Sequence, residues 1–190
     1  MPRWEPDARE RFVTAALELF TDQGYDETTV AQIADRAGLT RSTFFRHFSD
    51  KREVLAAGQA TLSRLFAEGI ASAPAEATPL EAVASGLATA AASMTPFNRE
   101  LGPRLEAVIA TSAELRDRAL LKQVGMAAAM ADALRARGVV DPVAATAAEL
   151  GVLAFHDAFS EWIADADAPP LADLLQTALG RLRAAVAQLG

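Results

Sequence analysis

The chain has 190 residues, of which 51% are hydrophobic and 23% are charged, so it can bury a sizeable core and does not have the composition of a disordered segment. It contains no cysteine, which excludes disulfides and cysteine-bound zinc, and its two histidines lie far apart. The net charge of −7 argues at first against a nucleic-acid partner, but an uneven distribution of charge can still leave one basic face.

No segment of the chain has the pattern of a membrane or export signal. The N-terminal residues 1–7 are not followed by an apolar run. The longest uncharged stretch, residues 82–98, is short for a membrane span and contains several polar residues. We therefore expect a cytoplasmic protein without a membrane partner, and the lack of ligand clusters predicts neither a metal nor a cofactor.

Helix-forming residues dominate the chain, and no stretch alternates between polar and apolar residues over the length of a strand. The sequence therefore predicts an all-α fold. Apolar spacing, caps and glycines predict helices at about residues 7–23, 29–37, 40–48, 50–73, 80–94, 103–110, 114–137, 142–164 and 171–189.

The three N-terminal helices have the layout of a helix-turn-helix. Thr29 and Gln32 have the spacing of a capping box, Gly38 supplies a tight turn, and Thr40 precedes the third helix. The stretch 36–52 carries five positive residues and one negative residue, a local charge of +4. Because a major groove admits one helix, we expect helix 40–48 to enter it.

The first turn of helix 40–48 carries side chains that can read bases. Arg41 can form two hydrogen bonds to guanine, and the hydroxyls of Ser42 and Thr43 can form hydrogen bonds to several bases. His47 and Lys51, four residues apart, are expected on the side of the DNA backbone. His47 could instead be an ordinary surface or packing residue.

Residues 17–55 resemble the DNA-binding domain of the TetR (tetracycline-repressor-like) family. The matching residues are Leu19-Phe20, Gly24-Tyr25, Thr28-Thr29-Val30, Ile33-Ala34, Ala37-Gly38-Leu39, Phe45, His47-Phe48 and Lys51. The rest of the chain agrees with the family only in its helical layout and length. The resemblance implies a helix-turn-helix DNA-binding domain at residues 1–55 and a helical ligand-binding and dimerisation domain at residues 56–190.

The resemblance also implies individual roles. It predicts that Thr29 bonds a phosphate and that Arg46 faces the bases together with the three residues that open helix 40–48. It predicts backbone contacts for Phe45, His47 and Lys51. The position of Phe45 is more often tyrosine in this family, and phenylalanine cannot donate the hydrogen bond that tyrosine makes there, so its contact would be apolar.

The later helices carry an aromatic stripe. Phe155, Phe159 and Trp162 recur at spacings of four and three, which fits ordinary core or dimer packing and equally fits one wall of an apolar pocket. Methionines suit an adaptable cavity but also fill cores. The candidate ligand-binding residues are Met94, Phe97, Leu101, Leu105, Met126, Met130, Phe155, His156 and Phe159.

The predicted function is a homodimeric transcription regulator that binds a palindromic operator on double-stranded DNA. We expect a repressor that a small apolar or amphipathic effector releases, with helices 142–164 and 171–189 forming a four-helix dimer interface. An activator of the same fold, or a helical binding protein without DNA affinity, stays open. We do not expect an enzyme, because His156-Asp157 with Glu161 is the only candidate cluster and no nucleophile accompanies it.

Overall fold

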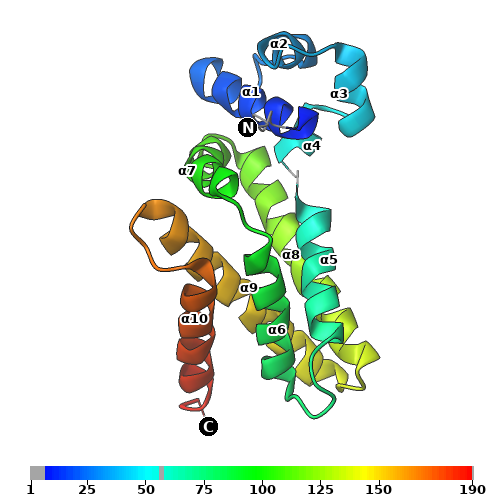
Figure 1. Ribbon diagram of the computed structural model, residues 1–190, viewed down its shortest axis with the longest axis vertical. Coiled ribbons are helices and arrows are strands. Elements are labelled where there is room, and N and C mark those ends of the chain that lie inside the picture. The colour runs from blue at the N-terminus through cyan, green and yellow to red at the C-terminus, as the bar shows by residue number, and fades with distance from the viewer. Residues whose placement is uncertain (1–6, 56–57, 190) are drawn as a thin grey trace, which may run out of the picture. The chain divides into compact units, whose positions relative to one another are not determined.

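The computed structural model describes residues 7–55 and 58–189, and every regular element within these ranges is a helix (Figure 1). The predicted all-α fold is confirmed. Residues 1–6, for which no export signal is predicted, and residues 56–57, at the predicted domain boundary, lie outside the described residues. The chain forms two compact units, one from residues 1–57 with 103–117 and the other from residues 58–102 with 118–190.

Four short helices open the first unit. They are α1 (Ala8–Gln23), α2 (Val30–Arg36), α3 (Arg41–His47) and α4 (Lys51–Leu55). Their core is aromatic: the Phe12 ring meets the Phe44 ring edge-on at 5.2 Å between centroids, and Phe48 packs against both. All three side chains are fully buried, so helix α3 is seated on α1 by its inner face. Its other residues are thereby turned outward.

Six further helices complete the chain. They are α5 (Gln59–Ala71), α6 (Pro79–Ala92), α7 (Pro96–Ala110), α8 (Ala113–Ala136), α9 (Asp141–Ala164) and α10 (Leu171–Val186). In the second unit, α5, α6, α8, α9 and α10 pack through one core, in which Phe66, Met130 and Ala154 are fully buried. Many of the core residues are alanines, which permit close approach of the helices. α10 runs beside α9 in Figure 1.

The prediction of one continuous helix from residue 50 to residue 73 is wrong. Helix α4 ends at Leu55 and α5 begins at Gln59, and Gly58 between them has a left-handed backbone with φ +94°. A right-handed helix cannot pass through that conformation. Helix α7 also begins earlier than predicted, at Pro96, because proline suits a first helical position, and it continues through Pro103.

Two glycines bring α5 and α6 into backbone contact. A Cβ atom on Gly69 would lie 2.6 Å from the Cα atom of Gly86, and a Cβ atom on Gly86 would lie 2.8 Å from the carbonyl oxygen of Phe66. No side chain therefore fits between the two helices at this point.

None of the helices in the described ranges is long and apolar enough to cross a bilayer.

Candidate nucleic-acid interface

Helix α2 begins with the predicted capping box. The amide of Gln32 donates to Thr29 Oγ1 at 3.3 Å, and the amide of Thr29 donates to Gln32 Oε1 at 2.8 Å. The Thr29 hydroxyl also donates to Gln32 Oε1, at 2.9 Å. Thr29 is exposed, but its only hydroxyl proton is already engaged, so a bond to phosphate requires that proton to leave Gln32.

The turn between α2 and α3 is fixed from α1. The guanidinium of Arg11 donates to the carbonyl oxygen of Ala37 at 2.5 Å and to that of Gly38 at 3.3 Å. Gly38 has φ +64°, a left-handed conformation that glycine adopts without steric cost. This role of Arg11 could not be predicted, because no local pattern connects residues 26 positions apart. Arg11 sets the turn from which α3 departs.

The outer face of α3 carries four exposed side chains. They are Arg41, Ser42, Phe45 and Arg46. Since residues three or four positions apart are neighbours on a helix surface, Phe45 lies beside Arg41 and Ser42, and Arg46 lies beside Ser42, so the four form one row. Phe45 is 53% exposed, which is unusual for phenylalanine and indicates that the folded unit does not use its ring as core.

Thr43 and His47 lie at the edges of this row. Both are half-buried. The amide of Thr43 donates to Thr40 Oγ1 at 3.1 Å, and the two hydroxyl oxygens are 2.9 Å apart, so Thr43 takes part in the cap of α3. The His47 ring lies 6.2 Å from the Phe12 ring between centroids. Each side chain is therefore partly used inside the unit.

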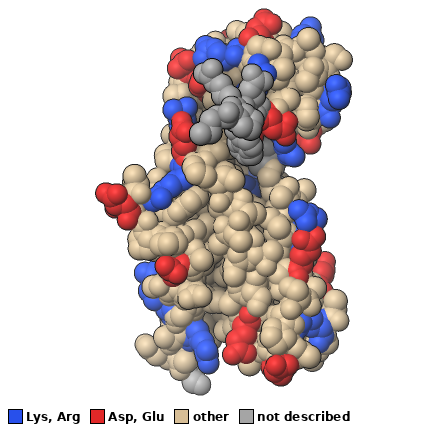
Figure 2. Space-filling model, in the orientation of Figure 1, with Lys and Arg blue, Asp and Glu red and all other residues tan. Residues whose placement is uncertain are grey.

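Most of the basic residues in the stretch 36–52 are already partnered. Arg36 pairs with Glu18 at 3.0 Å, and Arg52 pairs with Asp50 at 2.6 Å. In the part of the chain that the structure describes, Arg41 and Arg46 have neither an ion pair nor a hydrogen bond. Figure 2 shows acidic and basic side chains interspersed over the drawn face. The attraction of an anionic partner therefore depends on the unpaired cations of α3 more than on the net charge of the chain.

Lys51 points into the unit. Its ammonium donates to the carbonyl oxygens of Tyr25, Asp26 and Thr28 at 2.7, 3.1 and 2.9 Å. It also lies 4.4 Å from the centre of the Tyr25 ring. Because an ammonium has three donors, all of them are used here. Lys51 holds the turn before α2 in place, which the sequence analysis did not anticipate.

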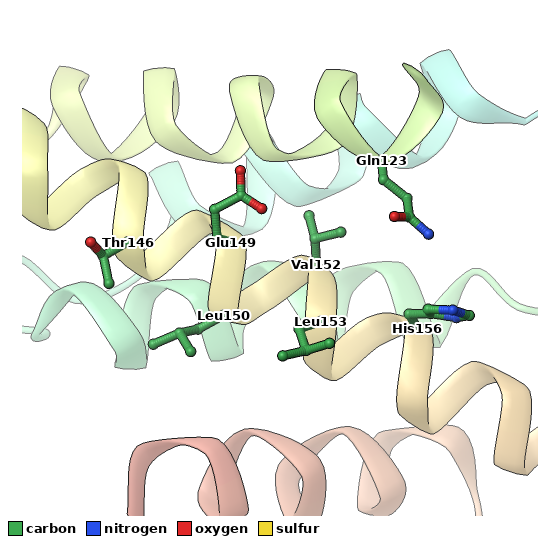
Figure 3. A pocket seen from close by; sticks show the side chains of 7 residues that line it. All are labelled: Gln123, Thr146, Glu149, Leu150, Val152, Leu153 and His156. Atoms are coloured by element: carbon green, nitrogen blue, oxygen red, sulfur yellow. The ribbon is translucent and has the colours of Figure 1, made fainter. Parts of the chain in front are cut away.

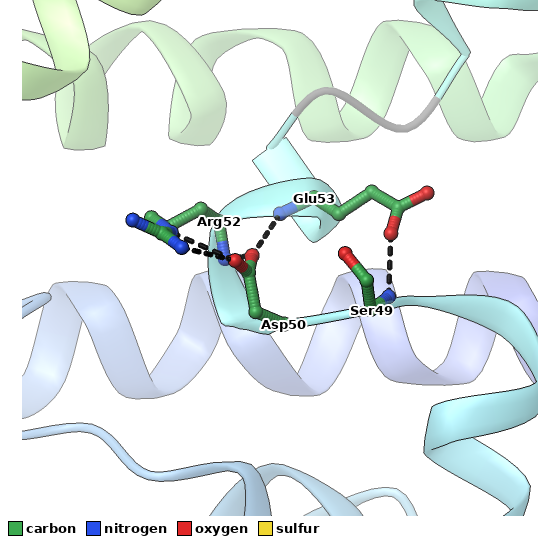
Figure 4. Close-up of polar contacts among 4 residues, drawn as sticks. All are labelled: Ser49, Asp50, Arg52 and Glu53. Carbon is green, nitrogen blue, oxygen red and sulfur yellow. Dashed lines mark hydrogen bonds and ion pairs between the residues drawn. The ribbon is translucent and has the colours of Figure 1, made fainter.

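The start of α4 is stabilised by two carboxylates (Figure 4). Asp50 accepts the amides of Arg52 and Glu53 at 2.8 and 3.0 Å, and the hydrogen bond from the Arg52 guanidinium is the main reason that the pKa of Asp50 is lowered. Glu53 accepts the amide of Ser49, which lowers its pKa. Asp50 accepts the amide of Glu53, but the amide that Glu53 reaches belongs to Ser49, so the two residues do not form a reciprocal capping box.

The candidate ligand-binding residues fall into several places. Met126, Met130 and Phe155 are buried in one cluster of the second unit, and Met94 and Phe159 pack against it half-buried. The Phe155 and Phe159 rings are stacked at 5.6 Å between centroids. The remaining three apolar candidates lie apart from this cluster; Leu101 is buried and Phe97 half-buried in the second unit, whereas Leu105 belongs to the first unit.

His156 is exposed and does not belong to that cluster. It borders a hollow of about 300 Å³ between α8 and α9, where Gln123 extends from α8 on the same side (Figure 3). The other lining residues are Thr146, Glu149, Leu150, Val152 and Leu153. Among the described residues, no group of three or more His, Asp or Glu residues is placed to bind a metal ion.

Helix α2, the turn at Gly38 and the outward row on α3 define a helix-turn-helix domain, here joined to a helical second unit. Residues 12–57 match the family model described as bacterial regulatory proteins, tetR family. The match covers the helix-turn-helix region and less than half of the chain.

Named relatives agree with this assignment. Over 74 residues the chain is 40% identical to the HTH-type transcriptional regulator TcmR of Streptomyces glaucescens, a match that covers 39% of this chain and 33% of TcmR. The chain therefore spans about a third of the length of that relative. Such relatives are transcriptional regulators and not enzymes.

Solved structures share the fold along nearly the whole chain. A putative TetR-family transcriptional regulator from Syntrophomonas wolfei superposes with a TM-score of 0.57 at 16% identity, covering 91% of both chains. SmeT of Stenotrophomonas maltophilia, in its complex with triclosan, gives 0.56 at 22% identity, covering 94% of this chain and 90% of that chain. At these identities the likeness concerns the fold.

Proposed function

We propose that the chain is a cytoplasmic DNA-binding repressor that reads a palindromic operator as a homodimer and leaves it when a small amphipathic effector binds residues 56–190. The observation that carries the proposal is the row of Arg41, Ser42, Phe45 and Arg46, which is exposed on a helix whose inner face is locked by buried phenylalanines. The two arginines lack protein partners among the described residues and are available to guanine or phosphate.

The other predicted DNA contacts are proposed with allowance for the contacts that these side chains already make inside the first unit. Thr43 reads a base through its methyl group and the free lone pair of its hydroxyl, since the oxygen is shared with Thr40. His47 reaches the DNA backbone with the ring nitrogen turned away from Phe12. Phe45 makes an apolar contact. Thr29 bonds a phosphate after its proton is released from Gln32, and Lys51 acts by holding the turn that precedes Thr29.

Dimerisation is proposed through α9 and α10. Apolar side chains on these helices stay exposed in the single chain, including Val143 and Leu153 on α9, both at 45%, and Val186 on α10 at 44%. Burying them in a four-helix interface would remove apolar surface from water. Release by an effector requires that the effector bind one conformer of the dimer more tightly than the DNA-bound conformer. The bound triclosan of SmeT supports this part of the proposal.

The test is selection of bound sequences from a random pool of duplex DNA, followed by gel-shift titration of the selected site. We expect a palindrome. Arg41→Ala and Arg46→Ala are expected to weaken binding to it by roughly tenfold or more each, since one bidentate pair contributes about 1–3 kcal/mol. Arg64→Ala, which removes an exposed arginine of α5, is the matched control and should bind as wild type. Selection without any preferred sequence would refute the proposal.

A further inference from the structure

Helix α8 has an inverted pattern of side chains near its middle. Lys122, Met126 and Met130 follow one another at spacings of four; Lys122 is half-buried and the two methionines are 4% and 0% exposed. Leu121 and Val124, which flank Lys122, are instead 68% and 63% exposed. A cation therefore lies on the core side of the helix and aliphatic side chains lie outside, which reverses the usual order.

The side chain of Lys122 is half-buried, and its ammonium has no protein partner among the described residues. Burial alone lowers the pKa of the Lys122 ammonium. Within the described residues no carboxylate lies within 4.0 Å of it, and no acceptor takes a hydrogen bond from it. A cation removed from water costs free energy unless an anion or several acceptors face it. A compensating group from outside the chain would recover this cost.

The surroundings of Lys122 along α8 define what kind of group could do so. One turn further, Met126 belongs to the cluster that contains Met130 and the stacked pair Phe155 and Phe159. A molecule that pairs with the ammonium and extends along α8 would lie against the edge of this cluster, where Phe159 is half-buried. Polarizable and aromatic side chains accommodate apolar groups of varied shape. The net charge of −7 disfavours anions in general, so an anionic molecule needs a local cation such as this one.

We propose that Lys122 anchors the carboxylate of an amphipathic effector, whose apolar part packs toward Met126 and the aromatic cluster. The inference rests on the proposed function, because it assigns a chemical class to the effector of the regulator. It also accounts for a lysine on the core side of α8.

The test compares charged and uncharged versions of the same probe. Decanoate and 4-phenylbutyrate, each with its primary amide, are titrated at pH 7 by calorimetry into the full-length protein and into the variants Lys122→Met and Lys122→Arg. We expect wild type to bind at least one carboxylate roughly tenfold tighter than its amide, as one charge-assisted hydrogen bond would give. Lys122→Met should lose this difference and Lys122→Arg should retain it.

Unliganded Lys122→Met provides a second readout. Because it replaces an unpaired cation by a side chain of similar length, its melting temperature should be higher than that of wild type, whereas loss of a structural contact would lower it. A saturating concentration of the carboxylate probe should reduce the difference in melting temperature between Lys122→Met and wild type.

Three outcomes overturn the inference. The first is equal affinity of wild type for each acid and its amide, and the second is no binding of either carboxylate. The third is a lower melting temperature of Lys122→Met together with weaker dimerisation in sedimentation, which would assign Lys122 to contact with a second copy of the chain. Operator binding is measured in parallel without probe. If wild type binds its selected DNA while these probes fail, the effector class is refuted and the regulator function stands.

Discussion

The ammonium of Lys51 lies over the Tyr25 ring, 4.4 Å from its centre, and also donates to the Tyr25 carbonyl oxygen at 2.7 Å. Two further carbonyl oxygens, those of Asp26 and Thr28, complete its coordination. One side chain at the start of α4 thus fixes the turn that leads into α2. Cation–ring contacts strengthen when they are shielded from water, and Tyr25 is buried.

Replacing Lys51 by Met is expected to destabilise the protein by about 1–3 kcal/mol, because three carbonyl oxygens lose their donor. Thermal and urea unfolding would measure this loss. Operator affinity should fall with it, but the slope of affinity against salt concentration should stay unchanged. A direct phosphate contact gives the opposite result, namely unchanged stability and a salt slope that falls by about one unit. Lys51→Arg is the control that keeps the charge.

Phe45→Tyr adds a hydroxyl to the exposed row of α3. We expect several-fold tighter binding to all DNA sequences, because the hydroxyl can donate to a phosphate, and little change in melting temperature, because the ring is 53% exposed. Phe44→Tyr is the matched control: that ring is fully buried, so the same added atom should lower the melting temperature. Unchanged DNA affinity in Phe45→Tyr would show that residue 45 does not approach the backbone.

Gly86→Ala is expected to destabilise the second unit by about 1–3 kcal/mol through overpacking against α5, despite the better helix propensity of alanine. Gly180→Ala in α10 serves as its control. No atom lies within 4 Å of a Cβ built there, so this variant should gain up to about 1 kcal/mol. Urea unfolding of both variants measures the difference, and similar effects of the two substitutions would contradict the contact between α5 and α6.

The start of α4 should make the first unit sensitive to acid. The Arg52 guanidinium holds the pKa of Asp50 below its ordinary 3.8, so ionised Asp50 contributes stability that is complete above about pH 4 and is lost as the pH falls through the lowered value. Asp50→Asn should therefore melt below wild type at pH 7, and the gap should close in the acid range. Salt should reduce the gap, because the pair is partly exposed. A gap that widens on acidification would contradict this assignment.

Local patterns in the sequence were sufficient for most of the fold. The Thr29–Gln32 box and the turn at Gly38 depend on residues within a few positions of each other, so both could be predicted. The roles of Arg11 and Lys51 could not, because each binds carbonyl oxygens of residues 23–27 positions away. The break at Gly58 was missed since a glycine inside a helical pattern is often tolerated.

The candidate ligand-binding residues could be predicted from the sequence only in part. Helical periodicity identified the aromatic stripe, and Phe155 and Phe159 do stack, but His156 was included among the candidates although it does not share the spacing of the stripe, and it is exposed. One residue along a helix turns the side chain by about 100°, which is enough to change its face.

The bare contact between Gly69 and Gly86 has a mechanical consequence. Because the backbones of α5 and α6 lie against each other there, neither helix can turn a larger side chain into the contact without collision, so the two helices keep one register at this point.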